Sequence, residues 1–220
     1  MTARSLEAQV EPSLRAGVQA LQLALSEVQI QQLLEYGQLL QKWSRIYNLT
    51  ALRSPSEIVT HHLLDSLAVI SPLRRKTEAG AGRLLDVGSG AGLPGVAIAI
   101  ACPDIHVTCV DAVAKKAAFV GQAAGALQLV NLRGIHSRVE SCSGQYDIVT
   151  SRAFASLSDF VELTRHLLAP GGIWMAMKGK NPTEELRELP SDVEVFHVEQ
   201  LEVPGLDAER CLIWIRPRGA

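Results

Sequence analysis

Three glycines at alternate positions form the segment best suited to chemistry: Gly88, Gly90 and Gly92 follow Asp86 at the end of an apolar run. Alternate glycines let a backbone turn tightly and approach a ligand, because no Cβ stands in the way. A loop between a parallel strand and a helix opens at the carboxyl edge of the sheet, where ligands bind in such folds. The spacing therefore predicts a ligand-binding loop.

A second acid, Asp111, ends the next apolar run, 23 residues after Gly88. A carboxylate in this place can accept hydrogen bonds from both ribose hydroxyls of a nucleoside cofactor. An ordinary strand, turn and helix without a ligand is the alternative, and the combination of three glycines with this acid disfavours it.

The charge beside the loop bears on which cofactor fits. Gly90-x-Gly92-x-x-Gly95 satisfies the pattern of a dinucleotide site, but that pattern alone is weak. Asp86 would repel a pyrophosphate, whereas it suits the ammonium and sulfonium groups of S-adenosylmethionine (AdoMet). These residues favour AdoMet over a dinucleotide.

The elements that must position these residues alternate between strand and helix patterns, which predicts βαβ units and a mostly parallel sheet. The predicted strands are 84–88, 107–111, 132–135, 146–150 and 173–178, and the predicted helices are 94–101, 113–124 and 156–168. Pro170-Gly171-Gly172 is expected to end the last helix. Two further runs, 193–203 and 211–215, predict a C-terminal antiparallel hairpin that closes the sheet.

The first 80 residues have helical patterns instead. Ser26 and Gln29 have the spacing of a capping box, and Ser54-Pro55-Ser56-Glu57 predicts a second helix start. Residues 74–82 are charged and contain glycine, which indicates a linker. The chain is therefore expected to divide into an N-terminal helical cap, 1–80, and an α/β domain, 81–220.

The composition of the chain disfavours several classes of protein. A formal charge of −2 over 220 residues does not indicate a globally basic nucleic-acid binder, although a local basic face remains open. The chain has no run of signal-peptide type or of membrane-spanning length. The four cysteines have no metal-ligand spacing, so free thiols and a cytoplasmic protein without a metal are expected.

Beyond the loop, several segments together resemble one family, the 16S ribosomal RNA guanine-N7 methyltransferases, also called the RsmG or glucose-inhibited division protein B family. The matching segments are Trp43 with NLTA (48–51), HHLLDSL (61–67), DVGSGAGLPG (86–95), VDAVAKKAAF (110–119), SRVES (137–141), SRAFASL (151–157), AMKGK (176–180) and VPGLDAER (203–210). The glycine loop alone would indicate only the methyltransferase superfamily.

The resemblance implies a class I AdoMet-dependent methyltransferase fold (Rossmann-like) and transfer of a methyl group to N7 of a guanine in the decoding-region loop of 16S rRNA. With the loop, it gives these cofactor-binding candidates: Asp86, Gly88, Gly90, Gly92, Leu93, Asp111, Val139, Glu140 and Arg152. The implied partner is 16S rRNA, the small ribosomal subunit or its precursor, and a monomer is expected. Lys115-Lys116 and Ser141 depart from the family pattern, outside the cofactor positions.

Guanine N7 carries a free lone pair, so its methylation needs neither a general base nor a metal. Arg152 and Lys178 are expected to act by positioning, and Arg138, Lys178 and Lys180 to bind RNA. Solvated loop charges are the alternative. His61-His62 does not form a metal clip, because adjacent helical residues point about 100° apart. Asn48, Asp65 and Ser66 are interpreted as structural, although the helical cap can help to frame an RNA pocket.

Other functions stay open on the residues alone. The substrate could be another RNA or a small molecule, in which case a lid over the site is expected. A dehydrogenase would bind NAD, and a non-catalytic AdoMet-binding or RNA-binding protein would bind without turnover.

Overall fold

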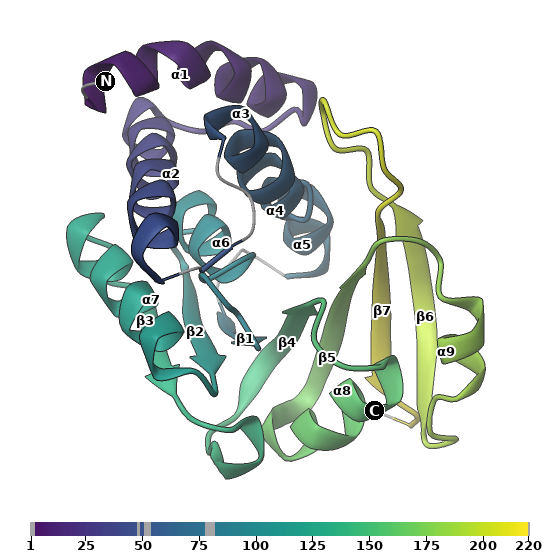
Figure 1. Cartoon of the computed structure of the whole chain (residues 1–220). Coiled ribbons are helices and arrows are strands. Elements are labelled where there is room, and N and C mark those ends of the chain that lie inside the picture. Colours follow the sequence, from purple (N-terminus) through teal and green to yellow (C-terminus); the bar gives the residue numbers. More distant parts are fainter. Residues whose placement is uncertain (1–2, 48, 51–53, 78–81, 220) are drawn as a thin grey trace.

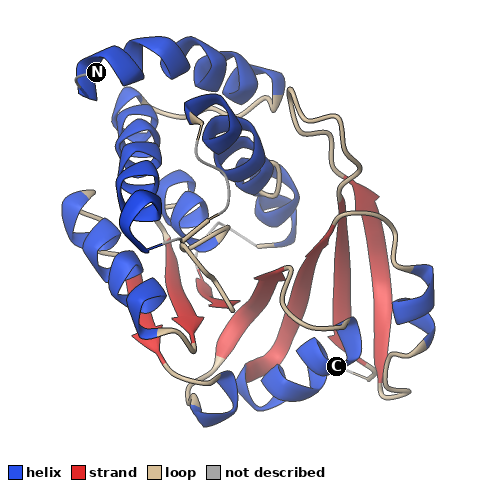
Figure 2. Cartoon of the chain, in the orientation of Figure 1, coloured by secondary structure: helices blue, strands red, loops and turns tan. Residues whose placement is uncertain are grey.

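A seven-stranded sheet forms the centre of the protein, in a computed structural model that describes residues 3–47, 49–50, 54–77 and 82–219. The strand order is β3-β2-β1-β4-β5-β7-β6, as Figures 1 and 2 show. The strands are β1 (Gly82–Val87), β2 (Ile105–Asp111), β3 (Leu132–His136), β4 (Tyr146–Arg152), β5 (Leu168–Lys178), β6 (Val193–Gln200) and β7 (Cys211–Pro217). The first five are parallel, and β7 pairs antiparallel with both β5 and β6. The predicted parallel sheet with a C-terminal antiparallel hairpin is confirmed.

Helices cover both faces of this sheet (Figure 1). The N-terminal ones are α1 (Ala3–Ala20), α2 (Glu27–Tyr47), α3 (Pro55–Ile58), the π-helical turn η1 (Val59–Leu64), α4 (Asp65–Leu67) and α5 (Ile70–Lys76). The later ones are α6 (Gly95–Ala101), α7 (Ala114–Ala126), η3 (Val139–Ser141), α8 (Leu157–Thr164), η4 (Arg165–Leu167) and α9 (Thr183–Arg187). One hydrophobic cluster joins the N-terminal helices with α6 and α7, and a second lies under α8.

Both predicted helix starts in the N-terminal part are present. Ser26 caps α2, and its Oγ accepts from the N–H of Gln29, while the Gln29 side chain accepts from the N–H of Ser26. Ser54 caps α3 with Glu57 in the reciprocal role. These paired bonds satisfy N–H groups that a helix cannot satisfy internally. The N-terminal helices share their core with the sheet, and the separation of 1–80 as a domain stays a prediction.

Three local expectations were wrong. Arg74, Arg75 and Lys76 are the last turn of α5, not a linker, and residues 78–81 lie outside the described part. Pro170-Gly171-Gly172 lies inside β5, where the positive φ of Gly171 (75°) accompanies a register shift against β4. The strand predicted for 193–203 ends at Gln200.

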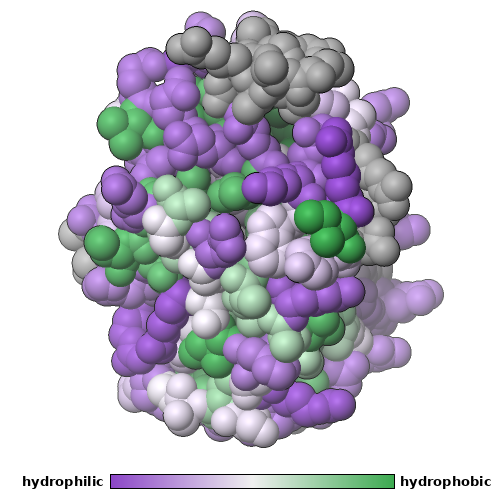
Figure 3. Space-filling model, turned by 60° about the vertical axis from the view of Figure 1, so that its left-hand side comes forward, coloured by the Kyte–Doolittle hydropathy of each residue, from purple (hydrophilic) through white to green (hydrophobic). Residues whose placement is uncertain are grey.

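The face over α2 and α7 is mainly hydrophilic in Figure 3, with hydrophobic side chains in small separate groups. Within the described residues, no helix has the length and hydropathy to cross a bilayer. Cys102, Cys109 and Cys211 are buried and Cys142 is half-buried, all as free thiols. The described residues contain no group of three metal-ligating side chains.

Candidate cofactor and substrate site

The glycine loop leaves β1 in a conformation that side chains disfavour. Gly88, Gly90 and Gly92 have φ values of 63°, 59° and 82°, in the left-handed region. A Cβ on Gly88 would lie 2.6 Å from Cδ2 of Phe154, in the segment after β4. The loop therefore needs glycine both for its backbone and for the close approach of this ring.

Asp111 fastens the loop to the start of α7. Its Oδ2 accepts from the N–H of Gly90 (2.9 Å) and its Oδ1 from the N–H of Val113 (2.8 Å). Lys116 Nζ lies 3.9 Å from Oδ2. Because a carboxylate oxygen can accept more than one hydrogen bond, both oxygens keep capacity for the hydroxyls of a ribose. These contacts fit the predicted ribose role.

We expect Asp111→Ala to weaken AdoMet binding by roughly 1–3 kcal/mol, the range for losing charge-assisted hydrogen bonds. Two backbone N–H groups lose their acceptor, and the cofactor loses the carboxylate. Calorimetry measures the dissociation constant, with Asp192→Ala on the surface as the matched control. An unchanged constant would mean that another residue holds the ribose.

Asp86 lies inside the protein behind the loop rather than in an open site. Its carboxylate is fully buried, and Oδ2 accepts from the N–H of Gly95 (2.8 Å). Burial raises the pKa of Asp86 to about 7, against the lowering effect of the Gly95 N–H. Within the described residues Oδ1 has no hydrogen-bond partner. Asp86 thus braces the first turn of α6, and its direct contact with a cofactor stays a prediction.

The N-terminal helices also support the loop, which the sequence did not indicate. The hydroxyl of Tyr36, on α2, donates to the carbonyl of Ala91 at 2.6 Å. Tyr36 is fully buried, and burial raises its pKa well above the usual value, so the hydroxyl stays protonated. The bond connects the helical cap directly to the loop between β1 and α6.

Tyr36→Phe should lower the free energy of unfolding by roughly 1–3 kcal/mol, because the buried carbonyl of Ala91 loses its donor. The loosened loop should also bind AdoMet more weakly. Chemical denaturation and calorimetry measure the two effects, and Tyr47→Phe at the exposed end of α2 is the control. Equal stability of wild type and Tyr36→Phe would show that this hydrogen bond does not support the loop.

The other cofactor candidates lie near the same edge of the sheet in different settings. Val139 is buried in η3, directly after β3, and Glu140 beside it is exposed. The side chain of Leu93 packs in the hydrophobic core. Their contacts with AdoMet, which the resemblance implies, stay predictions.

A wide cleft opens where β4 and β5 end, which we call the β4–β5 cleft. Its volume is about 490 Å³. The cleft is lined by His61, His62, Asp65, Arg152, Ala153, Met177, Lys178, Gly179 and Arg210. These residues come from η1, α4, the ends of two strands and the segment before β7. The N-terminal cap and the sheet therefore build this cleft together.

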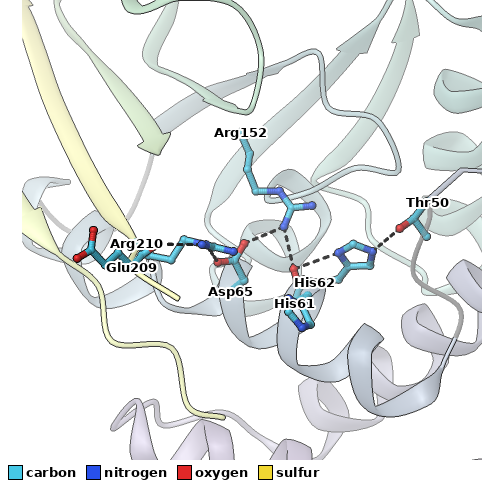
Figure 4. A network of polar contacts seen from close by, with 7 residues as sticks. All are labelled: Thr50, His61, His62, Asp65, Arg152, Glu209 and Arg210. Carbon is cyan, nitrogen blue, oxygen red and sulfur yellow. Dashed lines mark hydrogen bonds and ion pairs between the residues drawn. The ribbon is translucent and has the colours of Figure 1, made fainter. Parts of the chain in front are cut away.

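The floor of the cleft is a polar network around Asp65 (Figure 4). Arg152 Nη1 donates to Asp65 Oδ2 at 2.9 Å and to the carbonyl of His61 at 3.2 Å. Arg210 Nε donates to Asp65 Oδ1 at 2.6 Å. Asp65 is buried, whereas each arginine is 22% exposed. The arginines therefore face the cleft over a buried carboxylate.

His62 is held as a neutral ring beside this network. Its Nδ1 lies 3.1 Å from the carbonyl of His61, and its Nε2 lies 2.7 Å from Oγ1 of Thr50. Because a carbonyl only accepts, Nδ1 carries the proton and Nε2 accepts from Thr50. Burial and the charge of Arg152 lower the pKa of His62 to about 4. The ring is engaged at both nitrogens, as expected for a structural histidine.

The three predicted RNA-binding cations have different surroundings. Lys178 Nζ donates to Glu185 Oε2 (2.7 Å) and to the carbonyl of Ala155 (3.2 Å). Lys180 is exposed in an adjoining cleft formed by residues 178–185. Arg138 is exposed at the start of η3 and lines neither cleft. Lys178 thus lines the β4–β5 cleft but is already ion-paired with Glu185. Of these three cations, Lys180 is the one that is both exposed and close to this cleft.

Sequence reasoning missed two members of this site. Arg210 was visible only as the end of the segment 203–210, and Asp65 was interpreted as structural. Both stand in segments that resemble the family, 61–67 and 203–210, which was the available signal. Nothing in their local patterns pointed to a contact between them.

The strand order, the glycine loop and the acid at the end of β2 together define a class I AdoMet-dependent methyltransferase fold. AdoMet is the cofactor of this class, and the loop, with Asp111 beside it, fits a nucleoside cofactor. Within the class, the chain belongs to the GidB family, rRNA small subunit methyltransferase G, whose family model matches residues 29–213.

Curated relatives agree over nearly the whole length. The Ribosomal RNA small subunit methyltransferase G of Polaromonas sp. (strain JS666 / ATCC BAA-500) is 62% identical over 214 residues, covering 96% of this chain and 95% of the relative. The protein of the same name from Acidovorax ebreus (strain TPSY) is 60% identical over 216 residues, covering 94% and 96%.

Solved structures share the fold at low sequence identity. The N-methyltransferase NodS from Bradyrhizobium japonicum WM9, in complex with S-adenosyl-L-homocysteine, has a TM-score of 0.57 and 15% identity, covering 82% of this chain and 98% of NodS. A SAM-dependent methyltransferase from Aquifex aeolicus has a TM-score of 0.56 and 16% identity, covering 76% and 96%. These likenesses support the fold class alone.

Proposed function

We propose that the protein transfers the methyl group of AdoMet to N7 of a guanine in the decoding-region loop of 16S rRNA. It acts in the cytoplasm as a monomer, on the small ribosomal subunit or its precursor. The observation that best supports an RNA substrate is the β4–β5 cleft, which is wide and is lined by the guanidinium groups of Arg152 and Arg210. Both the family and the names of its curated members support rRNA of the small subunit.

AdoMet supplies an electrophilic methyl group on a sulfonium. The protein contributes by binding the cofactor and the base and by orienting them toward each other. Such positioning can supply much of the rate acceleration of a group transfer. The glycine loop and Asp111 hold the cofactor end, and the cleft at the ends of β4 and β5 receives the base. Methyl transfer moves positive charge to the purine, so a cation against the ring would oppose the reaction, and we expect Arg152 to hold phosphate or the cofactor carboxylate instead.

Two ionisable groups that line the cleft, Asp65 and His62, are already engaged, which suits an acceptor that needs no deprotonation. Asp65 is bound by two arginines, and both nitrogens of His62 are occupied. Guanine N7 attacks with a lone pair that no proton covers, whereas an exocyclic amine must lose a proton. This difference supports N7 over the exocyclic amine.

Mass spectrometry of nucleosides tests the proposal. We expect 16S rRNA from a strain that lacks the gene to lack one 7-methylguanosine, and purified protein with AdoMet to restore it. Naked 16S rRNA, partly assembled particles and complete 30S subunits should be compared as substrates. Restoration of a different modified nucleoside would refute N7 chemistry. AdoMet binding without any transfer to RNA would indicate a non-catalytic protein or a small-molecule enzyme.

A further inference from the structure

Two arginines from distant parts of the chain converge on one buried carboxylate. Asp65 accepts from Arg152, 87 residues away in sequence, and from Arg210, 145 residues away, each through a different oxygen. Figure 4 shows Asp65 between the two guanidinium groups. Two cations side by side repel each other, and the carboxylate between them offsets that repulsion. The group of three carries a net charge of +1.

Each guanidinium keeps donors for a further partner. Arg152 uses Nη1 for both of its contacts, and Arg210 uses Nε and Nη1. Among the described residues, no hydrogen bond involves Nη2 of either arginine. Both side chains are partly exposed and line the β4–β5 cleft. Planar guanidinium forks with spare donors match the oxygens of a phosphate.

We propose that Arg152 and Arg210, held side by side by Asp65, bind one backbone phosphate of the RNA next to the methylated guanine. The proposal deepens the rRNA methyltransferase function above and rests on it. Arg152 and Arg210 contact the phosphate, and Asp65 is a positioning residue that sets the spacing of the two guanidinium groups.

The position of Arg210 favours RNA phosphate over the carboxylate of the cofactor. Arg210 directly precedes β7, which lies beyond β5 in the sheet, whereas the glycine loop follows β1. Between those strands stand β4 and β5, so Arg210 approaches the cleft from the side opposite the cofactor loop. A ligand that uses both arginines therefore enters from the substrate side.

The test measures RNA binding rather than turnover. Affinity for a decoding-region RNA fragment is followed by fluorescence anisotropy across a salt series, with S-adenosylhomocysteine present, and AdoMet affinity by calorimetry. We expect Arg210→Ala to weaken RNA binding at least tenfold and to lower the salt slope by about 1, with AdoMet affinity unchanged. Arg216→Ala, which removes an exposed arginine of β7 paired with Glu194, should leave both affinities unchanged.

Asp65→Asn separates positioning from simple electrostatics. Removing a negative charge near an anion site should strengthen RNA binding if charge alone matters. We expect weaker binding instead, because the arginines lose their common anchor. If Asp65→Asn does not fold, Arg210→Lys tests the same geometry, since a lysine keeps the charge but lacks the planar fork, and it should bind RNA several-fold more weakly than wild type.

The outcomes distinguish this site from the function. If RNA binding and its salt slope are unchanged in Arg210→Ala, or if AdoMet affinity falls instead, the phosphate site is wrong even where 7-methylguanosine forms. If the Arg210 effects appear but no 7-methylguanosine forms, the phosphate site stands and the proposed reaction fails. RNA with a neutral methylphosphonate at the contacted position should bind wild type more weakly. The same RNA should lose less affinity for Arg210→Ala, because only Arg152 then remains to contact the phosphate.

Discussion

The Gly88→Val protein is expected to fold and to lose AdoMet binding by more than about 100-fold, which is roughly 2.8 kcal/mol at 1.4 kcal/mol per tenfold. Gly88 has a φ of 63°, which a β-branched residue strongly resists. Its Cβ would also lie 2.6 Å from the ring of Phe154. The ring can move aside, but the backbone must still leave the conformation that opens the loop.

A matched variant shows whether added bulk alone has this effect. Gly125, in α7, has no positive φ, and a Cβ added there would meet no atom within 4 Å other than its chain neighbours and the backbone of its own helix. Gly125→Val should therefore bind AdoMet normally. Circular dichroism checks that both variants fold, and calorimetry measures the affinity. A folded Gly88→Val protein with near-normal affinity would place the cofactor elsewhere.

Arg152→Ala is expected to reduce methyl transfer into small-subunit rRNA more than tenfold, at least about 1.4 kcal/mol of transition-state stabilisation. The substitution leaves Asp65 with one arginine instead of two and removes the donor to the carbonyl of His61. Arg152→Lys should restore little activity, because a single ammonium lacks the planar fork that reaches several acceptors.

Tritium transfer from AdoMet into the rRNA measures this loss beside AdoMet binding. Arg165→Ala is the control, since Arg165 pairs with Asp192 at the surface, outside the cleft. If Arg152→Ala methylates at the wild-type rate, Arg152 has no role in the site, and the role implied by the family resemblance is wrong.

The parts of the fold that could be predicted are those that depend on residue patterns within short segments of the chain. Strand and helix periods differ, so β1 to β5 and the helices between them are readable from residue spacing alone. The order of the last strands is not local. Both strands of the C-terminal hairpin have similar patterns, and nothing in either shows that β7 rather than β6 pairs with β5.

The candidate site likewise has a part that local sequence patterns predict and a part that depends on tertiary contacts. Only α6 and β2 lie between the glycine loop and Asp111, and the roles of the loop and Asp111 follow from residue type and place. Asp65 and Arg210 meet only after the whole sheet has formed, so no spacing rule relates them. Lys178 was correctly placed at the end of β5, but its pairing with Glu185 depends on how α9 packs, which the sequence does not show.

The long sequence separations around Asp65 have a consequence for the order in which the enzyme is completed during translation. The contacts that fasten the glycine loop involve residues up to Val113. Arg210, the C-terminal partner of Asp65, is synthesised 97 residues after Val113. At typical synthesis rates this is a delay of roughly 5–20 s. A nascent or truncated chain can therefore contain every residue of the cofactor loop while Asp65 still has an incomplete set of partners. Such a chain lacks the finished floor of the cleft, so the proposed phosphate site is among the last parts of the protein to form.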